Sequence, residues 1–124
     1  MNLDLTRTLN KTYNKIFDKD FLFECDDGWY EIISNLCAKI QQECDATGCE
    51  QVKALQVKEK FAALRFYVCG GNENIGKFID EAFKQSVITC EVTGNYGKLC
   101  KRGSWYKTLC NESAVLLGYE RVED

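Results

Sequence analysis

The feature that most constrains this chain is a pair of short cysteine motifs in its C-terminal third. The first runs Cys90-Glu-Val-Thr93-Gly94 and the second runs Cys110-Asn-Glu-Ser113. Zinc knuckles place two thiolates as Cys-x-x-Cys-Gly, and the second ligand pair comes later, from the start of a helix. Here the spacing and the glycine are kept, but a hydroxyl residue takes the second place of each pair. We therefore expect a fold built for a four-ligand centre in which two ligands have been replaced.

The segment between the two motifs predicts a hairpin. Strands are expected at about 97–99 and 104–106, across a turn at 101–103, and Cys110 is expected to begin a helix that runs through Leu117. Knuckle, hairpin and helix then follow one another in the order of a treble clef, and Gly94 lets the backbone turn so that its N–H groups point at thiolates.

The donor set is poor for zinc. Zinc takes about four ligands near tetrahedral, and Cys90 and Cys110 supply two, with Cys100 a third if the hairpin brings it inward. The hydroxyls of Thr93 and Ser113 stay protonated at neutral pH. Three alternatives stay open: a metal-free lobe with buried thiols, a residual zinc site, and a disulfide. We favour the first, so we expect no cofactor, with zinc as the alternative, and the Cys90 and Cys110 sulfurs close together even without metal.

The remainder of the chain predicts a mixed α and β core. Apolar residues recur at helical spacing over about 4–18, 27–45 and 74–86, and alternate or cluster as in strands over about 52–57 and 61–68. The second helix is indicated most clearly, by a stripe of Trp29, Ile33, Leu36, Cys37, Ile40 and Cys44, and Gly48 is placed to end it. Lys58-Glu59-Lys60 is expected to turn between the strands. The expected architecture is α+β: residues 1–88 form a core of helices on a small antiparallel hairpin or sheet, and residues 89–124 a degenerate zinc-knuckle lobe packed on it, in one compact domain.

Composition excludes several classes of protein. The chain has no histidine, so it has no Ser-His or Cys-His nucleophile pair and no histidine general base. We therefore expect that it is not an enzyme. No apolar run is long enough to cross a membrane, and the N-terminus lacks the apolar stretch of a signal peptide. These features favour a cytoplasmic protein whose eight cysteines are reduced, and no membrane partner.

Several motifs together resemble a family of small uncharacterised proteins of bacteria and their phages. The motifs are Gly28-Trp29-Tyr30, Val57-Lys-Glu-Lys-Phe61, Leu64-Arg-Phe-Tyr-Val68 and the C-terminal Thr-Cys-Glu-x-x-Gly…Gly-Lys-Leu…Gly-x-Trp…Thr-Leu-Cys pattern, and they cover about residues 23–115. In that family the C-terminal segment looks like a Cys-x-x-Cys-Gly knuckle followed by a Cys-x-x-Cys or Cys-x-x-His pair. This chain departs from the pattern at Thr93 and Ser113, and has Cys100 where the family tends to have a basic residue. The resemblance implies a fold and a phage or bacterial setting, and it implies no activity.

Aromatic and basic residues are concentrated in the C-terminal lobe, which makes it the best candidate for binding. Such residues suit stacking on bases with phosphate contacts, and also suit a protein interface. The cluster consists of Tyr96, Lys98, Lys101, Arg102, Trp105, Tyr106 and Lys107. Two functions therefore remain. The first is a non-enzymatic protein-binding factor, such as a phage inhibitor or adaptor of a host protein machine, for example a defence system. The alternative is a nucleic-acid-binding module that uses this lobe. The net charge of −3 argues weakly against broad capture of nucleic acid.

Overall fold

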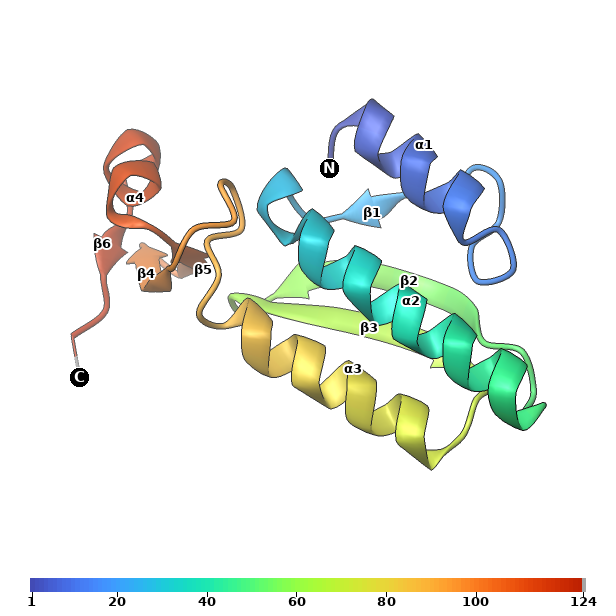
Figure 1. The fold of residues 1–124 in the computed structure, drawn as a ribbon. Helices are drawn as coiled ribbons and strands as arrows, with labels where there is room; N and C mark the ends of the chain where they lie inside the picture. Colours follow the sequence, from blue (N-terminus) through green and yellow to red (C-terminus); the bar gives the residue numbers. More distant parts are fainter. Residues whose placement is uncertain (124) are drawn as a thin grey trace.

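Four helices and two small sheets make up the α+β fold of residues 1–123, which the computed structural model describes (Figure 1). In chain order the elements are α1 (Leu3–Thr12), β1 (Phe23–Glu24), the 3-10 turn η1 (Asp27–Trp29), α2 (Tyr30–Thr47), β2 (Lys53–Lys60), β3 (Ala63–Cys69), α3 (Glu73–Ser86), β4 (Lys98–Arg102), β5 (Trp105–Leu109), α4 (Asn111–Leu117) and β6 (Glu120–Arg121). None of the helices in this range is long and apolar enough to span a bilayer. The expected α+β class is therefore confirmed.

The larger layer is a three-stranded sheet, in the order β1-β2-β3, with α2 and α3 side by side on it (Figure 1). The stripe predicted for the second helix is confirmed, because all six of its residues are buried in one core. Gly48 ends α2 in the left-handed conformation at φ 68°, where its N–H donates to the Cys44 carbonyl at 2.9 Å. The short strand β1, parallel to β2, was not predicted.

The first helix is shorter than its apolar pattern predicts. It ends at Thr12, and the chain then turns, so that Ile16 and Phe17 are buried from a loop and not from a helix. The Ile16 carbonyl accepts a hydrogen bond from the Ala54 N–H at 2.9 Å. Because a helical pattern records burial and not backbone conformation, this tertiary contact could not be read from the spacing.

The turn between β2 and β3 is also displaced from the predicted Lys58-Glu59-Lys60. Strand β2 continues through Lys60, and Phe61 and Ala62 make the turn with φ of 50° and 65°. Both residues are left-handed, which matches the strand twist but is unusual without glycine or asparagine. The Glu59 carboxylate accepts from the Ala62 N–H at 2.9 Å, and the Thr108 hydroxyl donates to the Ala62 carbonyl at 2.7 Å. Contacts from the strand and from β5 therefore hold this turn.

The smaller layer is the C-terminal lobe, which lies at one end of the larger layer (Figure 1). Its sheet has the order β5-β4-β6, and α4 packs beside it. The strands of its hairpin are longer than predicted and turn at Gly103 and Ser104, because Arg102 still pairs with Trp105. The lobe has its own small core of Cys90, Cys100, Leu109, Ala114 and Tyr119, whereas the buried residues of the main core fall within residues 9–82.

Candidate functional site

The first cysteine motif folds as a tight knuckle. Thr89 and Tyr96 pair as an isolated bridge, the Cys90 N–H donates to the Asn95 carbonyl at 2.6 Å, and the Gly94 N–H donates to the Cys90 carbonyl at 2.9 Å. Gly94 has φ 82°, a conformation that L side chains rarely adopt. The predicted need for glycine at this position is confirmed.

The second motif brings its side chains against the first. Cys110 precedes α4, and its sulfur lies 3.3 Å from the Ser113 hydroxyl oxygen. The Cys90 sulfur lies 3.6 Å from the same oxygen, and the Thr93 hydroxyl donates to the Cys110 sulfur at 3.7 Å. We call Cys90, Thr93, Cys110 and Ser113 the tetrad. The expectation that the two sulfurs lie close together is confirmed, because one hydroxyl touches both.

Hydrogen bonds change the acidity of Cys90, which is completely buried. Burial alone would raise the pKa of its thiol. Hydrogen bonds to the sulfur outweigh this effect of burial and lower the pKa of the thiol from 9.0 to about 7. They come from the hydroxyl and backbone N–H of Thr93, the backbone N–H of Cys110 and the hydroxyl of Ser113. The thiol nevertheless has no access to solvent, so it is poorly placed to act as a nucleophile.

The tetrad does not fit zinc. Its donors are two thiols and two hydroxyls, and a neutral hydroxyl is a weak ligand beside a thiolate. Cys100 is buried in the same small core, but its sulfur contacts the carbonyl oxygens of Lys98 at 3.4 Å and Leu109 at 3.9 Å. Within residues 1–123 no group of three or more His, Cys, Asp or Glu residues is arranged to hold a metal ion. The hypothesis of a third thiolate ligand from Cys100 therefore gains no support.

All eight cysteines are free thiols in the structure. The only sulfur pair in hydrogen-bond contact within the described part of the chain is Cys44 with Cys49, at 3.7 Å across the end of α2. Burial is the main reason that the pKa values of Cys25 and Cys37 are raised, to about 12 for Cys25. Both thiols are therefore neutral residues of the core.

A buried carboxylate attaches the lobe to the main core. Glu91, in the knuckle, is 1% exposed, and its two oxygens accept from the Asp26 N–H at 3.1 Å and from the Lys107 ammonium at 3.2 Å. Burial raises the pKa of Glu91 and Lys107 opposes that rise, while Glu91 keeps the pKa of Lys107 above its ordinary value in spite of burial. Sequence reasoning missed Glu91 because one acidic residue between a cysteine and a valine gives no signal of burial.

The motif Gly28-Trp29 forms the other half of this attachment. The Gly28 N–H donates to the Glu91 carbonyl at 2.7 Å, and the Trp29 indole N–H donates to the Thr89 carbonyl at 2.9 Å. Trp29 is fully buried in the main core. A glycine beside a tryptophan at a helix start was a signal that could have indicated a close backbone approach.

Most of the residues predicted for binding are open to solvent, whereas Lys107 and Arg102 make specific contacts. The exposed residues are Tyr96, Lys98, Lys101, Trp105 and Tyr106. Lys107 is half-buried in its ion pair with Glu91, so it belongs to the attachment and not to an open surface. Arg102 is exposed, but its guanidinium donates to the Leu117 carbonyl at 2.8 Å and lies 4.8 Å from the centre of the Tyr119 ring.

Arg102 lies between two exposed apolar groups, Trp105 on β5 and the end of α4, of which only the first was predicted. Trp105, which faces Arg102 across the hairpin, is 69% exposed, and the outer side of α4 adds Leu116 at 84%. We call this the Trp105–α4 surface, and it consists of Arg102, Trp105, Val115, Leu116 and Leu117. The α4 residues were not among those predicted for binding, because three consecutive apolar residues in a short helix do not show which side is exposed.

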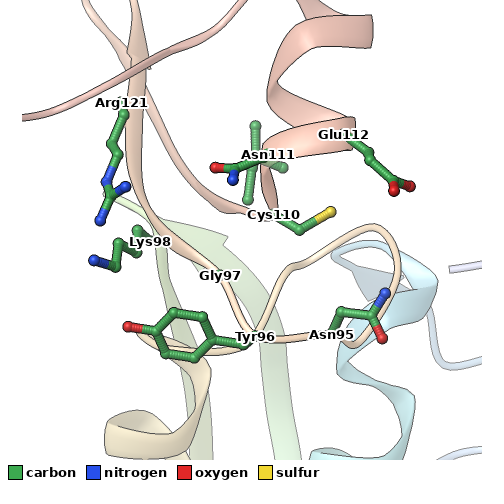
Figure 2. Close-up of a pocket in the computed structure, with 9 residues that line it drawn as sticks. Asn95, Tyr96, Gly97, Lys98, Cys110, Asn111, Glu112 and Arg121 are labelled. Atoms are coloured by element: carbon green, nitrogen blue, oxygen red, sulfur yellow. The ribbon is translucent and has the colours of Figure 1, made fainter.

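A polar hollow of about 300 Å³ lies in the lobe beside the tetrad (Figure 2). Figure 2 shows the nitrogen atoms of Lys98 and Arg121 close together on one wall, the ring of Tyr96 below them, and Cys110 and Asn111 opposite. Arg121 pairs with Cys100 in the sheet, which puts it on the same face as Lys98. No carboxylate among residues 1–123 lies within 4.0 Å of either cation. Arg121 was not predicted, because its strand β6 gave no sequence signal.

Comparison of this chain with protein-family models, with curated proteins and with solved structures found no match.

Proposed function

We propose that this protein is a non-enzymatic binding factor that recognises a protein partner through the Trp105–α4 surface. The observation that carries the proposal is the exposure of Trp105 beside a fixed arginine that also binds the end of α4, where Leu116 is exposed. Tryptophan and arginine are the residues that dominate protein interfaces when they lie together in a rigid setting.

Rigidity supports the proposal further. Arg102 is held at one end by the Leu117 carbonyl and along its plane by Tyr119, so ordering it on binding costs little entropy. Val115, at 79% exposed, extends the apolar area beside Leu116. Trp105 and the exposed residues of α4 form an apolar area of the kind that marks a contact site on a small protein.

The family resemblance suggests the kind of partner. If the chain acts as small phage proteins do, the partner is a host protein machine, for example a defence system, which the factor inhibits or adapts. The absence of histidine and the complete burial of the Cys90 thiol support a binding role over catalysis.

Trp105→Ala is expected to weaken partner binding about tenfold or more, because truncating a central tryptophan removes a hot spot. The test captures proteins from a bacterial host lysate with three tagged baits: the wild-type protein, Trp105→Ala and Leu22→Ala. Quantitative mass spectrometry identifies the captured partner, and its affinity for each bait is then measured with purified protein. Leu22 is the matched control, since it is 72% exposed but lies before β1, outside the lobe. A partner retained equally by all three proteins would contradict the use of this surface.

A second candidate function, binding of single-stranded nucleic acid, is favoured by the polar hollow. Tyr96 is 65% exposed and offers a ring for stacking on a base, and Lys98 and Arg121 offer two cations for phosphate. The acidic net charge of −3 weighs against tight non-specific binding, so this remains the second candidate.

The nucleic-acid candidate predicts a specific salt dependence. Anisotropy of a labelled random single-stranded oligonucleotide should report binding that weakens as salt rises, and removing either cation (Lys98→Ala or Arg121→Ala) should reduce the salt slope by about 1. Lys77→Ala, on α3, is the control, because it removes one exposed cation far along the chain from the hollow. An unchanged anisotropy at low salt would eliminate this candidate and leave the protein-binding proposal intact.

A further inference from the structure

The tetrad occupies the place where a four-ligand zinc site would have its four ligands. Cys90 and Thr93 come from the knuckle, and Cys110 and Ser113 come from the start of α4. We propose that these four side chains replace a metal ion altogether, so that hydrogen bonds among thiols and hydroxyls join the knuckle to α4 and the lobe is folded without zinc. The inference concerns the interior of the lobe and does not depend on what its surfaces bind.

The distances support direct contact among the side chains. The three measured contacts are 3.3 Å from Cys110 to Ser113, 3.6 Å from Cys90 to Ser113 and 3.7 Å from Thr93 to Cys110. Each joins a sulfur to a hydroxyl oxygen with the geometry of a hydrogen bond, so the four side chains contact one another directly.

The chemistry of the hydroxyl explains how one residue can bridge two sulfurs. A serine hydroxyl has one proton to donate and two lone pairs that accept, so Ser113 can serve Cys90 and Cys110 together. The Thr93 hydroxyl donates to the Cys110 sulfur and also accepts from the Asn95 N–H at 3.2 Å. A third or fourth thiolate would add negative charge that needs a cation, whereas two neutral hydroxyls add none.

Other contacts supply the fixation that a metal would otherwise provide. The knuckle is closed by its own backbone hydrogen bonds, and Glu91 attaches it to Asp26 and Lys107. Cys90 and Cys100 are buried with Leu109, Ala114 and Tyr119 in a small apolar core. The lobe therefore has packing as well as hydrogen bonds around the tetrad.

The test measures metal content and restores the missing thiols. Wild-type protein purified from zinc-supplemented cells is expected to carry far less than one zinc per chain, and a chelator should leave its thermal unfolding midpoint unchanged. The variant Thr93→Cys/Ser113→Cys is expected to bind about one zinc per chain, to give the thiolate charge-transfer bands of tetrahedral Co²⁺, and to lose thermal stability on chelation. Thr8→Cys/Ser104→Cys is the matched control, because it adds two thiols at exposed positions outside the tetrad.

Two results would overturn the proposal. The first is stoichiometric zinc in the wild-type protein whose removal unfolds the lobe. The second is a Thr93→Cys/Ser113→Cys variant that folds but takes up no more zinc than the control. If that variant does not fold, the wild-type measurement decides alone, and Ser113→Ala adds a second readout. Ser113→Ala should lower the unfolding midpoint in chelator and in zinc alike, because it removes the hydroxyl that links both sulfurs; a midpoint that zinc restores would contradict the metal-free lobe.

Discussion

Gly28→Ala is expected to destabilise the protein by about 3 kcal/mol or more and to loosen the C-terminal lobe. A Cβ at this position would overlap the carbonyl oxygen of Cys90 and lie 2.5 Å from that of Glu91. Both obstacles are backbone atoms, so no rotamer change can relieve them and the knuckle must move away from η1. That movement stretches the hydrogen bonds from Gly28 to Glu91 and from Trp29 to Thr89. Urea unfolding measures the loss, and hydrogen exchange of the Gly94 and Tyr119 amides locates it in the lobe.

Gly76→Ala is the matched control for this prediction. Gly76 lies on the exposed side of α3, and a Cβ there would meet nothing within 4 Å. Alanine should therefore stabilise the helix by about 0.5–1 kcal/mol. Equal effects of the two substitutions, or normal protection of the lobe amides in Gly28→Ala, would contradict the close approach of η1 and the knuckle.

The elements whose sequence pattern is local were predicted well, because local physics decides them. The buried stripe of α2 and the left-handed Gly48 depend on helical period and on one glycine, and both are present. The end of α1 and the turn at Phe61 and Ala62 were misplaced, because contacts from distant residues fix them. The Ala54 N–H donates to the Ile16 carbonyl, and the Thr108 hydroxyl donates to the Ala62 carbonyl. Such contacts have no signature in the local sequence.

The candidate site divides in the same way. The knuckle and the approach of Cys90 to Cys110 followed from spacing and from one glycine, and they appear in the structure. The partners of Lys107 and Arg102 did not follow, since a cation within an aromatic segment looks solvent-exposed whether it faces water or a buried carboxylate. Arg121 was missed because a two-residue strand gives no periodicity. A sequence therefore indicates which residue types can bind, while long-range pairing decides which of them remain free.

Lys107→Met is the second substitution with a large expected effect, because it leaves the Glu91 carboxylate buried without its cation. We expect a loss of about 2–3 kcal/mol near neutral pH, since a buried charge that loses its partner retains its desolvation cost. Lys107 is a quarter exposed, which places the expected loss below that of a fully enclosed pair. The variant Glu91→Gln/Lys107→Met should regain most of this loss, because no unpaired charge remains and the amide oxygen can still accept from the Asp26 N–H.

The pH dependence of Lys107→Met gives an independent check. Burial already raises the pKa of Glu91 and Lys107 opposes the rise, so removing Lys107 raises this pKa further. The folded variant then takes up a proton at a pH where the unfolded chain, with an ordinary glutamate, is still ionised, so acidification through that window stabilises the fold. The deficit relative to wild type should therefore shrink between about pH 7 and about pH 5 in urea unfolding. Lys77→Met, which removes an exposed pair with Glu73 at 4.0 Å, should cost less than about 0.5 kcal/mol at either pH. A deficit that stays constant with pH would place the effect of Lys107 in its packing and not in its charge.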